Sequence, residues 1–267
     1  MRRFLVLGVL ALLGPLLLYS PAAPATESAD KGVTIAYEAD RRDAGFGDFA
    51  ATVSMTLRNK AQSESRREMS IKVLEGGSGD DGDKSLIRFS KPGDIEGTTL
   101  LTHSRKIGND DQWIFLPAVK RVKRISSTNR SGAFAGSEFA YEDLVNQEPD
   151  KYTYAWIRDE DLNGGPAFVV ERVPVYDGSG YTRQVVWYDK AEYRIQRIEY
   201  YDRKNELLKT LNISGYEKYL GQHWRAREMV MVNHQTGKST TLVWQDYKFA
   251  TGLSEVDFNK NKLRNAR

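Results

Sequence analysis

Apolar and polar residues alternate along most of the chain after residue 50. In the first such segment the residues at odd positions from Ala51 to Leu57 are apolar and those between them are polar or charged. This period of two is typical of strands that bury one face. The pattern recurs, with turns rich in Gly, Asn and Asp between the segments, at residues 69–73, 98–107, 152–158, 167–173, 182–188, 194–201, 207–216, 224–232 and 239–249. The sequence therefore predicts a mainly β domain with an antiparallel sheet that curls or closes.

Helix is expected in only a few places. Residues 35–49 mix sparse apolar positions with Ala, Glu, Asp and Arg, which predicts one short amphipathic helix that ends near two glycines. Residues 254–263 predict a short terminal helix with Ser254 as its N-cap. A third helical stretch is expected within residues 126–147.

The first 25 residues have the pattern of a cleaved export signal. Arg2 and Arg3 precede an apolar run at residues 4–18, and Ala23-Pro24-Ala25 has the small-residue spacing of a cleavage site. A membrane anchor is the alternative, but a spanning helix needs about 20 apolar residues and this run is shorter. We therefore expect a single mature domain at residues 26–267.

Composition argues against several classes of function. Of the 267 residues 40% are hydrophobic, which suffices for a buried core. The formal charge is +3, and two of the positive charges lie in the export signal, so no strong field would attract nucleic acid. Cysteine is absent, which excludes disulfides, thiolate metal ligands and a lipid anchor at the cleavage site.

No catalytic motif stands out. The histidines His103, His223 and His234 are each isolated, and the chain has neither H-E-x-x-H nor G-x-S-x-G nor a nucleotide-binding glycine pattern. Residues 76–83 resemble a calcium loop only in their acids and predict an exposed hairpin loop. We expect no enzyme activity, no cofactor and no metal. A hydrolase with two carboxylates brought together by folding stays open.

The most unusual segment is the apolar run at residues 113–116, which Pro117 ends. Because a strand shows alternate residues to opposite faces, both of its faces need apolar cover or a ligand. Trp113 and Phe115 share one face, whereas Ile114 and Leu116 share the other.

A loop rich in Ser, Asn and Gly follows this run. It carries the large apolar residues Phe134, Phe139, Tyr141 and Leu144 at isolated positions. Such a composition is typical of a lid over an apolar hollow. The simpler interpretation is a core strand followed by an ordinary loop that buries its aromatic residues.

Between the run and the loop lies the basic cluster Lys120, Arg121, Lys123 and Arg124. It is either a solvated strand end or a docking surface for acidic partner residues or lipid phosphates. If the strand continues past Pro117, alternation prevents the four cations from sharing one face.

The same region carries a family resemblance. The residues concerned are Asp110-Asp111-Gln112-Trp113, Leu116-Pro117-Ala118, Lys120-Arg121-Val122, Arg124-Ile125-Ser126-Ser127, Asn129-Arg130-Ser131-Gly132 and Tyr141-Glu142-Asp143-Leu144. They resemble the signature run of LolA-like outer-membrane lipoprotein-sorting proteins, and the resemblance extends over residues 45–256. It is nearer to the relatives often encoded beside RND-type exporters than to the LolA chaperone itself.

The resemblance implies a fold and a task. LolA-like proteins are incomplete, strongly curved antiparallel half-barrels in which short helices cover the open side and the hollow accepts acyl chains. It implies a soluble periplasmic carrier that moves lipid or lipoprotein acyl chains toward the outer membrane without catalysis. The alternative is an accessory interaction module of an RND-type exporter, with a hollow filled by its own side chains.

We assign site residues on this basis. Trp113 and Phe115 are predicted to line the hollow, although the opposite face of the strand stays open. The predicted lid residues are Phe134, Phe139, Tyr141 and Leu144, and the predicted docking residues for a partner or lipid head groups are Lys120, Arg121, Lys123 and Arg124. We expect no nucleic acid partner and only transient membrane contact.

Overall fold

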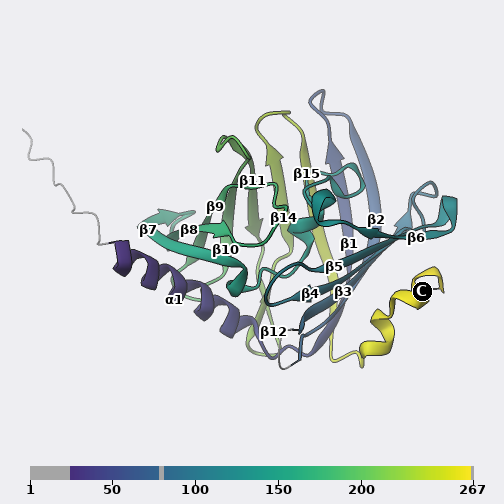
Figure 1. Ribbon diagram of the computed structural model, residues 1–267, viewed down its shortest axis with the longest axis horizontal. Helices are drawn as coiled ribbons and strands as arrows, with labels where there is room; N and C mark the ends of the chain where they lie inside the picture. Colours follow the sequence, from purple (N-terminus) through teal and green to yellow (C-terminus); the bar gives the residue numbers. More distant parts are fainter. Residues whose placement is uncertain (1–24, 78–80, 266–267) are drawn as a thin grey trace, which may run out of the picture.

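One large, curved, unclosed antiparallel sheet forms the fold, as the computed structural model shows (Figure 1). The structure describes residues 25–77 and 81–265, so the predicted export signal lies, but for Ala25, outside the described residues. The strands of the large sheet are β1 (Asp48–Arg58), β2 (Glu64–Leu74), β3 (Asp81–Lys91), β4 (Thr99–Arg105), β5 (Asp111–Leu116), β6 (Arg121–Ile125), β7 (Tyr152–Leu162), β8 (Gly165–Pro174), β9 (Arg183–Asp189), β10 (Ile195–Tyr201), β11 (Leu207–Ser214), β14 (Glu228–Asn233) and β15 (Ser239–Phe249). The mainly β half-barrel prediction is confirmed.

The strand order explains the shape of the molecule. It runs β6-β5-β4-β3-β2-β1-β15-β14-β11-β10-β9-β8-β7, so β6 and β7 are consecutive in the chain but form the two opposite edges. Residues 126–151, which we call the crossing segment, connect these edges and pass over one face of the sheet (Figure 1). This segment contains the 3-10 helices η2 (Ser127–Asn129), η3 (Phe134–Gly136), η4 (Tyr141–Leu144) and η5 (Pro149–Lys151).

The remaining elements are short, apart from one helix. Helix α1 (Ala25–Asp43) packs on edge strand β7, and β12 (Glu217–Tyr219) pairs with β13 (His223–Arg225) in a small hairpin. The 3-10 turn η1 (Pro117–Val119) lies between β5 and β6. Two further 3-10 turns, η6 (Glu255–Phe258) and η7 (Lys260–Asn265), follow the last strand. No helix among the described residues is long and apolar enough to span a membrane.

Several predicted boundaries were wrong. Helix α1 begins ten residues earlier than the predicted residues 35–49, because its first turns lie against β7. A Cβ on Gly32 would lie 2.9 Å from the backbone nitrogen of Trp156, so glycine permits this close approach. The predicted terminal helix is present only as the 3-10 turns η6 and η7, which follow Ser254.

The sequence pattern also missed two strands of the large sheet and the short strand β12, and it merged two others. β3 has the adjacent apolar residues Leu86 and Ile87, one on each face, which hides its alternation. β6 is mostly charged, and residues 224–232 form β13 and β14 rather than one strand. The strand pattern is clearest where one face is buried and the other solvated. β3 has buried residues on both faces, and β6 is largely exposed on both.

The two faces of the sheet have different covers. We call concave the face that contacts α1 and the crossing segment, and outer the opposite face. The concave core includes Ile35 from α1 together with Phe134 and Phe139 from the crossing segment. On the outer face, residues 253–265, here the terminal segment, place Phe258 and Leu263 against β3, β4 and β5.

Candidate functional site

The concave face is apolar, and the crossing segment fills it. Phe134 and Phe139 are 1% and 3% exposed, and the Phe134 ring stacks on Phe89 of β3 with the centroids 5.5 Å apart. Apart from four tyrosines on β7, β9 and β10, the buried sheet residues of this core are Val53, Met55, Met69, Ile71, Ile87, Phe89, Leu100, Ile114, Val170, Val186, Ile198, Leu211, Ile213, Met231 and Leu242. Two rings of the protein's own chain thus occupy the inside of the half-barrel.

The four predicted lid residues all lie on this face. Phe134 and Phe139 belong to the buried core, whereas Tyr141 and Leu144 are partly buried and pack against it. Phe134 and Tyr141 also make an edge-on ring contact at 5.7 Å. The structure therefore brings the predicted lid residues together, and their role in lipid binding stays a prediction.

Trp113 and Phe115 do not join them, which corrects the predicted grouping. Both lie on the outer face and pack with Phe258 and Leu263 of the terminal segment. Ile114, one position away, faces the concave core. The aromatic pair is partly buried and supports the packing of a surface segment, because the sheet is covered on both faces here.

The predicted docking cations lie at one edge of the sheet and are all exposed. The β5–β6 register pairs Arg121 with Leu116 and Lys123 with Ile114, so both lie on the concave side. Arg124 pairs with Trp113 on the outer side, where its guanidinium lies 2.5 Å from the carboxylate of Asp111. β5 ends before Pro117, but the cations that follow lie in the new strand β6, which points Arg121 and Lys123 to one face and Arg124 to the other, so the four cations do not form one surface. Lys120 sits in the turn before β6, in a left-handed conformation with φ of 51°.

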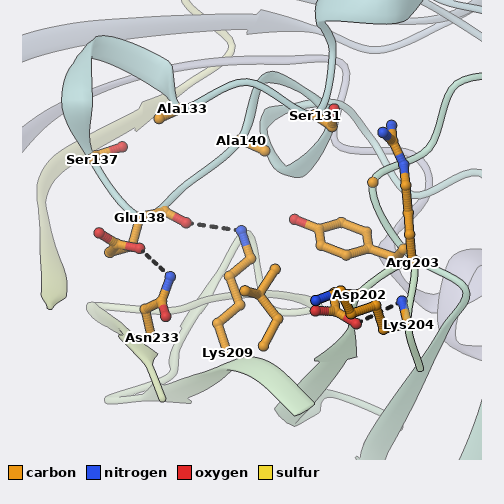
Figure 2. Close-up of a pocket in the computed structure, with 13 residues that line it drawn as sticks. Ser131, Ala133, Ser137, Glu138, Ala140, Asp202, Arg203, Lys204, Lys209 and Asn233 are labelled. Atoms are coloured by element: carbon orange, nitrogen blue, oxygen red, sulfur yellow. Dashed lines mark hydrogen bonds between the residues drawn. The ribbon is translucent and has the colours of Figure 1, made fainter. Parts of the chain in front are cut away.

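Buried polar contacts hold the middle of the crossing segment. The Lys209 ammonium on β11 lies 2.6 Å from the Asp143 carboxylate, and their side chains are only 4% and 2% exposed. Asp143 also accepts hydrogen bonds from Tyr181 Oη at 2.8 Å and from the Ala140 backbone N–H at 2.7 Å. Lys209 donates a further bond to the Glu138 carbonyl at 2.8 Å (Figure 2). This pair fixes η4 against the sheet.

Glu142 attaches the same helical turn to the β8–β9 loop. It accepts hydrogen bonds from Gly180 N–H at 2.8 Å, Ser179 Oγ at 2.9 Å and Tyr176 Oη at 3.2 Å. Burial raises the pKa of Glu142 above its usual range, and the neighbouring Asp143 adds to this effect. The three donors offset part of that rise because they favour the carboxylate form.

A second buried ion pair joins the end of the segment to the β4–β5 turn. Lys151 pairs with Asp110, and both side chains are almost fully buried. Arg130 from the start of the segment lies 4.0 Å from the same carboxylate and donates to Asn109 Oδ1 at 2.9 Å. Burial lowers the pKa of Lys151, although Asp110 acts in the opposite direction. Both ends of the crossing segment therefore meet at one buried carboxylate.

Comparison with known proteins identifies the family. A domain from Vibrio parahaemolyticus, described as that of an outer membrane lipoprotein-sorting protein, is 55% identical over 88% of this chain and 99% of that one, with a TM-score of 0.86. The chain belongs to this LolA-like lipoprotein-sorting family. A DUF1329 family protein from Desulfovibrio piger is 30% identical over 88% of this chain and 99% of that one, with a TM-score of 0.83.

Other comparisons agree with this placement. A family model described as an uncharacterized protein matches residues 81–265. A LolA superfamily protein from Nitrosomonas europaea, 21% identical over 88% of this chain and 98% of that one, shares the fold with a TM-score of 0.68. A search of curated proteins finds no match.

Two cavities lie beside the covers of this LolA-like protein. One, of about 420 Å³, lies between the crossing segment and the β10–β11 hairpin, and its lining includes Glu138, Lys209 and Asn233 (Figure 2). Asn233 Nδ2 donates to Glu138 Oε2 at 2.7 Å, so a polar contact closes one side of it. The other, of about 350 Å³, lies on the outer face beside Phe115 and Leu263.

The buried polar contacts of the crossing segment leave little signal in the sequence. The run Tyr141-Glu142-Asp143-Leu144 contributed to the family resemblance, but nothing in it indicates that both acids are buried. Lys209 has the same parity as the apolar Leu211 and Ile213, and Arg172 has that of Val170, which is the available signal. Among the described residues, no group of three or more acids and histidines is arranged to hold a metal ion.

Proposed function

We propose that this LolA-like protein carries lipids or the acyl chains of lipoproteins across the periplasm toward the outer membrane, without catalysis. The observation that carries the proposal is the position of Phe134 and Phe139, which occupy the apolar concave face as an acyl chain would. An acyl chain in water costs about 0.8 kcal/mol per CH₂ group, so a carrier must enclose it. Displacement of the crossing segment would expose that face to cargo.

The fold makes such a displacement local. The crossing segment runs from β6 to β7 and contributes no strand to the large sheet. Its removal would therefore break no pairing between strands of that sheet. Loops and covers that open in this way regulate access in many binding proteins.

The test is direct. Protein purified from the periplasm is extracted with organic solvent and the extract is analysed by mass spectrometry, while the purified protein is titrated with a fluorescent acyl probe. Phe139→Ala should raise probe affinity because it vacates part of the concave face. The control Phe258→Ala, on the outer face, should not. An extract without lipid, with no probe binding by either the parent or Phe139→Ala, would contradict a carrier.

A second candidate is an interaction module for a membrane exporter of the RND type. It is favoured by the filled interior and by Lys120, Arg121 and Lys123, which are exposed and form no ion pair among the residues described. Reversing these three charges should weaken association with a partner or with anionic vesicles in a salt-sensitive way. Acyl probe uptake should be unchanged. Loss of uptake with association intact would contradict a docking role.

Periplasmic location is part of the proposal. It is supported by the lipoprotein-sorting relatives and by the export pattern of residues 1–25. The mature protein should begin at Thr26, which intact mass and N-terminal sequencing of periplasmic protein would test. Recovery of a chain that retains Met1 in the inner membrane would contradict it.

A further inference from the structure

Arg172 is a buried cation on the concave face. On β8, Val169 packs on the outer face and Val170 on the concave face, so alternation places Arg172 on the concave side. The residue is 2% exposed, and its guanidinium lies 4.5 Å from the centre of the Tyr152 ring. Tyr154, Tyr188 and Tyr200 surround it.

Its hydrogen-bond partners are neutral. Nε donates to Gln184 Oε1 at 2.8 Å, and Nη2 donates to Gln147 Oε1 at 3.0 Å. Within residues 25–77 and 81–265, no carboxylate lies close enough to form an ion pair with Arg172. The guanidinium stays charged at any pH of interest, so this is a buried positive charge without a counterion.

The other buried basic residues are different. Lys209 pairs with Asp143, and Lys151 and Arg130 pair with Asp110. A buried charge without a partner is unfavourable, because neutral hydrogen bonds replace only part of its lost hydration. Of the four buried basic residues, Arg172 alone, within the described chain, lacks a carboxylate. A ligand that supplies the missing negative charge would remove this difference.

Gln147 marks the place for such a ligand. Its Oε1 accepts from Arg172 Nη2 at 3.0 Å and also from Tyr152 Oη at 2.6 Å. Gln147 is half-buried and belongs to the crossing segment, whereas Arg172 and Tyr152 belong to the sheet. The amide oxygen therefore stands in for a ligand oxygen, held by two donors that would remain when the segment moves.

We propose that Arg172 and Tyr152 form the head-group site for a single-chain lipid with an anionic head, which replaces the Gln147 oxygen. The inference rests on the proposed carrier function and names its cargo class. The acyl chain would extend over Val186, Ile198 and Leu211 on the neighbouring strands. A carboxylate and a phosphate monoester share the required chemistry, since both present paired anionic oxygens to a guanidinium. A neutral acyl ester has no anionic head group, so only its acyl chain could contribute to binding.

The test uses three probes of equal chain length: dodecanoate, dodecyl phosphate and methyl dodecanoate. Each is titrated below its aggregation limit at pH 8 against the mature protein, Arg172→Met and a control, Arg66→Met on β2, whose side chain is 77% exposed. The parent and the control should bind at least one anionic probe roughly tenfold or more tightly than the ester. Arg172→Met should bind all three about equally. Which anion binds more tightly separates a carboxylate from a phosphate head.

The outcomes separate the inference from the proposed function. If the parent binds the three probes equally, the head-group site is wrong and the carrier stands. If the parent binds none of them, the carrier and the site both fail. If Arg172→Met keeps the parent's preference, the site is wrong as well.

A second variant covers the case in which Arg172→Met does not fold. Gln147→Glu keeps the shape of the side chain and places a carboxylate against Arg172. It should lower affinity for the anionic probes roughly tenfold while leaving methyl dodecanoate binding within about twofold. It should also raise the thermal midpoint, because the buried cation gains a counterion. An unchanged ratio of anion to ester affinity in Gln147→Glu would overturn the proposal.

Discussion

The crossing segment and the terminal segment cover opposite faces of the same sheet in different ways. Each inserts two large apolar side chains with similar burial, since Phe134 and Phe139 are 1% and 3% exposed and Phe258 and Leu263 are 1% and 2% exposed. Only the crossing segment also carries buried charges, such as Asp143. The terminal segment has an ion pair between Glu255 and Lys84, but the Glu255 side chain is 70% exposed.

The difference indicates what each cover is built to do. A segment held by apolar contacts alone can detach in small steps, because each step costs only a small part of its binding free energy. A buried ion pair adds little net stability over an apolar pair, but it makes any misplaced arrangement costly because one charge is left unpaired. The crossing segment should therefore have two discrete states, seated and released, whereas the terminal segment should fray.

The largest expected effect comes from breaking the buried pair of the crossing segment. Asp143→Ala leaves Lys209 buried without a counterion and should lower the free energy of unfolding by about 3–5 kcal/mol. Urea denaturation with fluorescence detection measures the change. The double variant Asp143→Ala, Lys209→Met should recover much of the loss, because it removes the unpaired charge. A double variant as unstable as the sum of its single changes would show that the pair is not coupled.

The next effect concerns the terminal segment. Truncating a buried phenylalanine typically costs about 3–5 kcal/mol, but a segment at the end of the chain can detach instead. Phe258→Ala should therefore lose only about 2 kcal/mol, limited by the binding energy of the segment. Limited trypsin digestion should cleave at Lys260 and Lys262 before the rest of the chain. Val256→Ala, at a residue that is 57% exposed, is the control and should leave the digestion unchanged.

The sequence predicted the sheet better than its covers. Alternation along β1 and β2 depends on which face is buried, and that information is local. The covers depend on contacts between residues far apart in the chain, such as Asp143 with Lys209 and Phe258 with Leu101. No local pattern reports such a contact.

The error at Trp113 and Phe115 has the same origin. A strand that is apolar on both faces shows that both are covered, but not which cover lies on which face. The terminal segment that covers these two residues lies about 140 positions later in the sequence, and its own pattern predicted only a short helix. The four lid residues were easier to place because a single loop carries them all.

A smaller effect, on pH dependence, should come from the polar end of the crossing segment. Asn146 Nδ2 donates to Asp83 Oδ2 at 3.1 Å and to Glu148 Oε1 at 3.2 Å. Burial raises the pKa of Asp83 to about 7, with Glu148 contributing, and burial also raises the pKa of Glu148. The native state therefore binds protons more tightly than the unfolded chain. The resulting stability is fully present below about pH 4 and is lost as pH rises through about 7.

This contribution should be modest because Asp83 keeps some exposure. We expect the parent protein to lose about 1–2 kcal/mol more stability between about pH 4 and 7 than Asp83→Asn, in which Glu148 still contributes to the loss. Urea denaturation at a series of pH values measures the difference between the two curves. Parallel curves for the parent and Asp83→Asn would show that Asp83 titrates normally in the native state.

The smallest effect compares the two ion pairs directly. A double-mutant cycle on Lys84 and Glu255 should give a coupling energy of about 0.2–1 kcal/mol, because the exposed carboxylate keeps most of its hydration. Added salt should reduce it further, since exposed charges are screened. The same cycle on Lys209 and Asp143 should give a larger coupling that salt leaves nearly unchanged, because water and ions do not reach the pair. Salt sensitivity thus separates the two covers even if their total stabilities are similar. Equal salt dependence in the two cycles would mean that solvent reaches Asp143 in the native state, and the seated crossing segment would then be open on a short timescale.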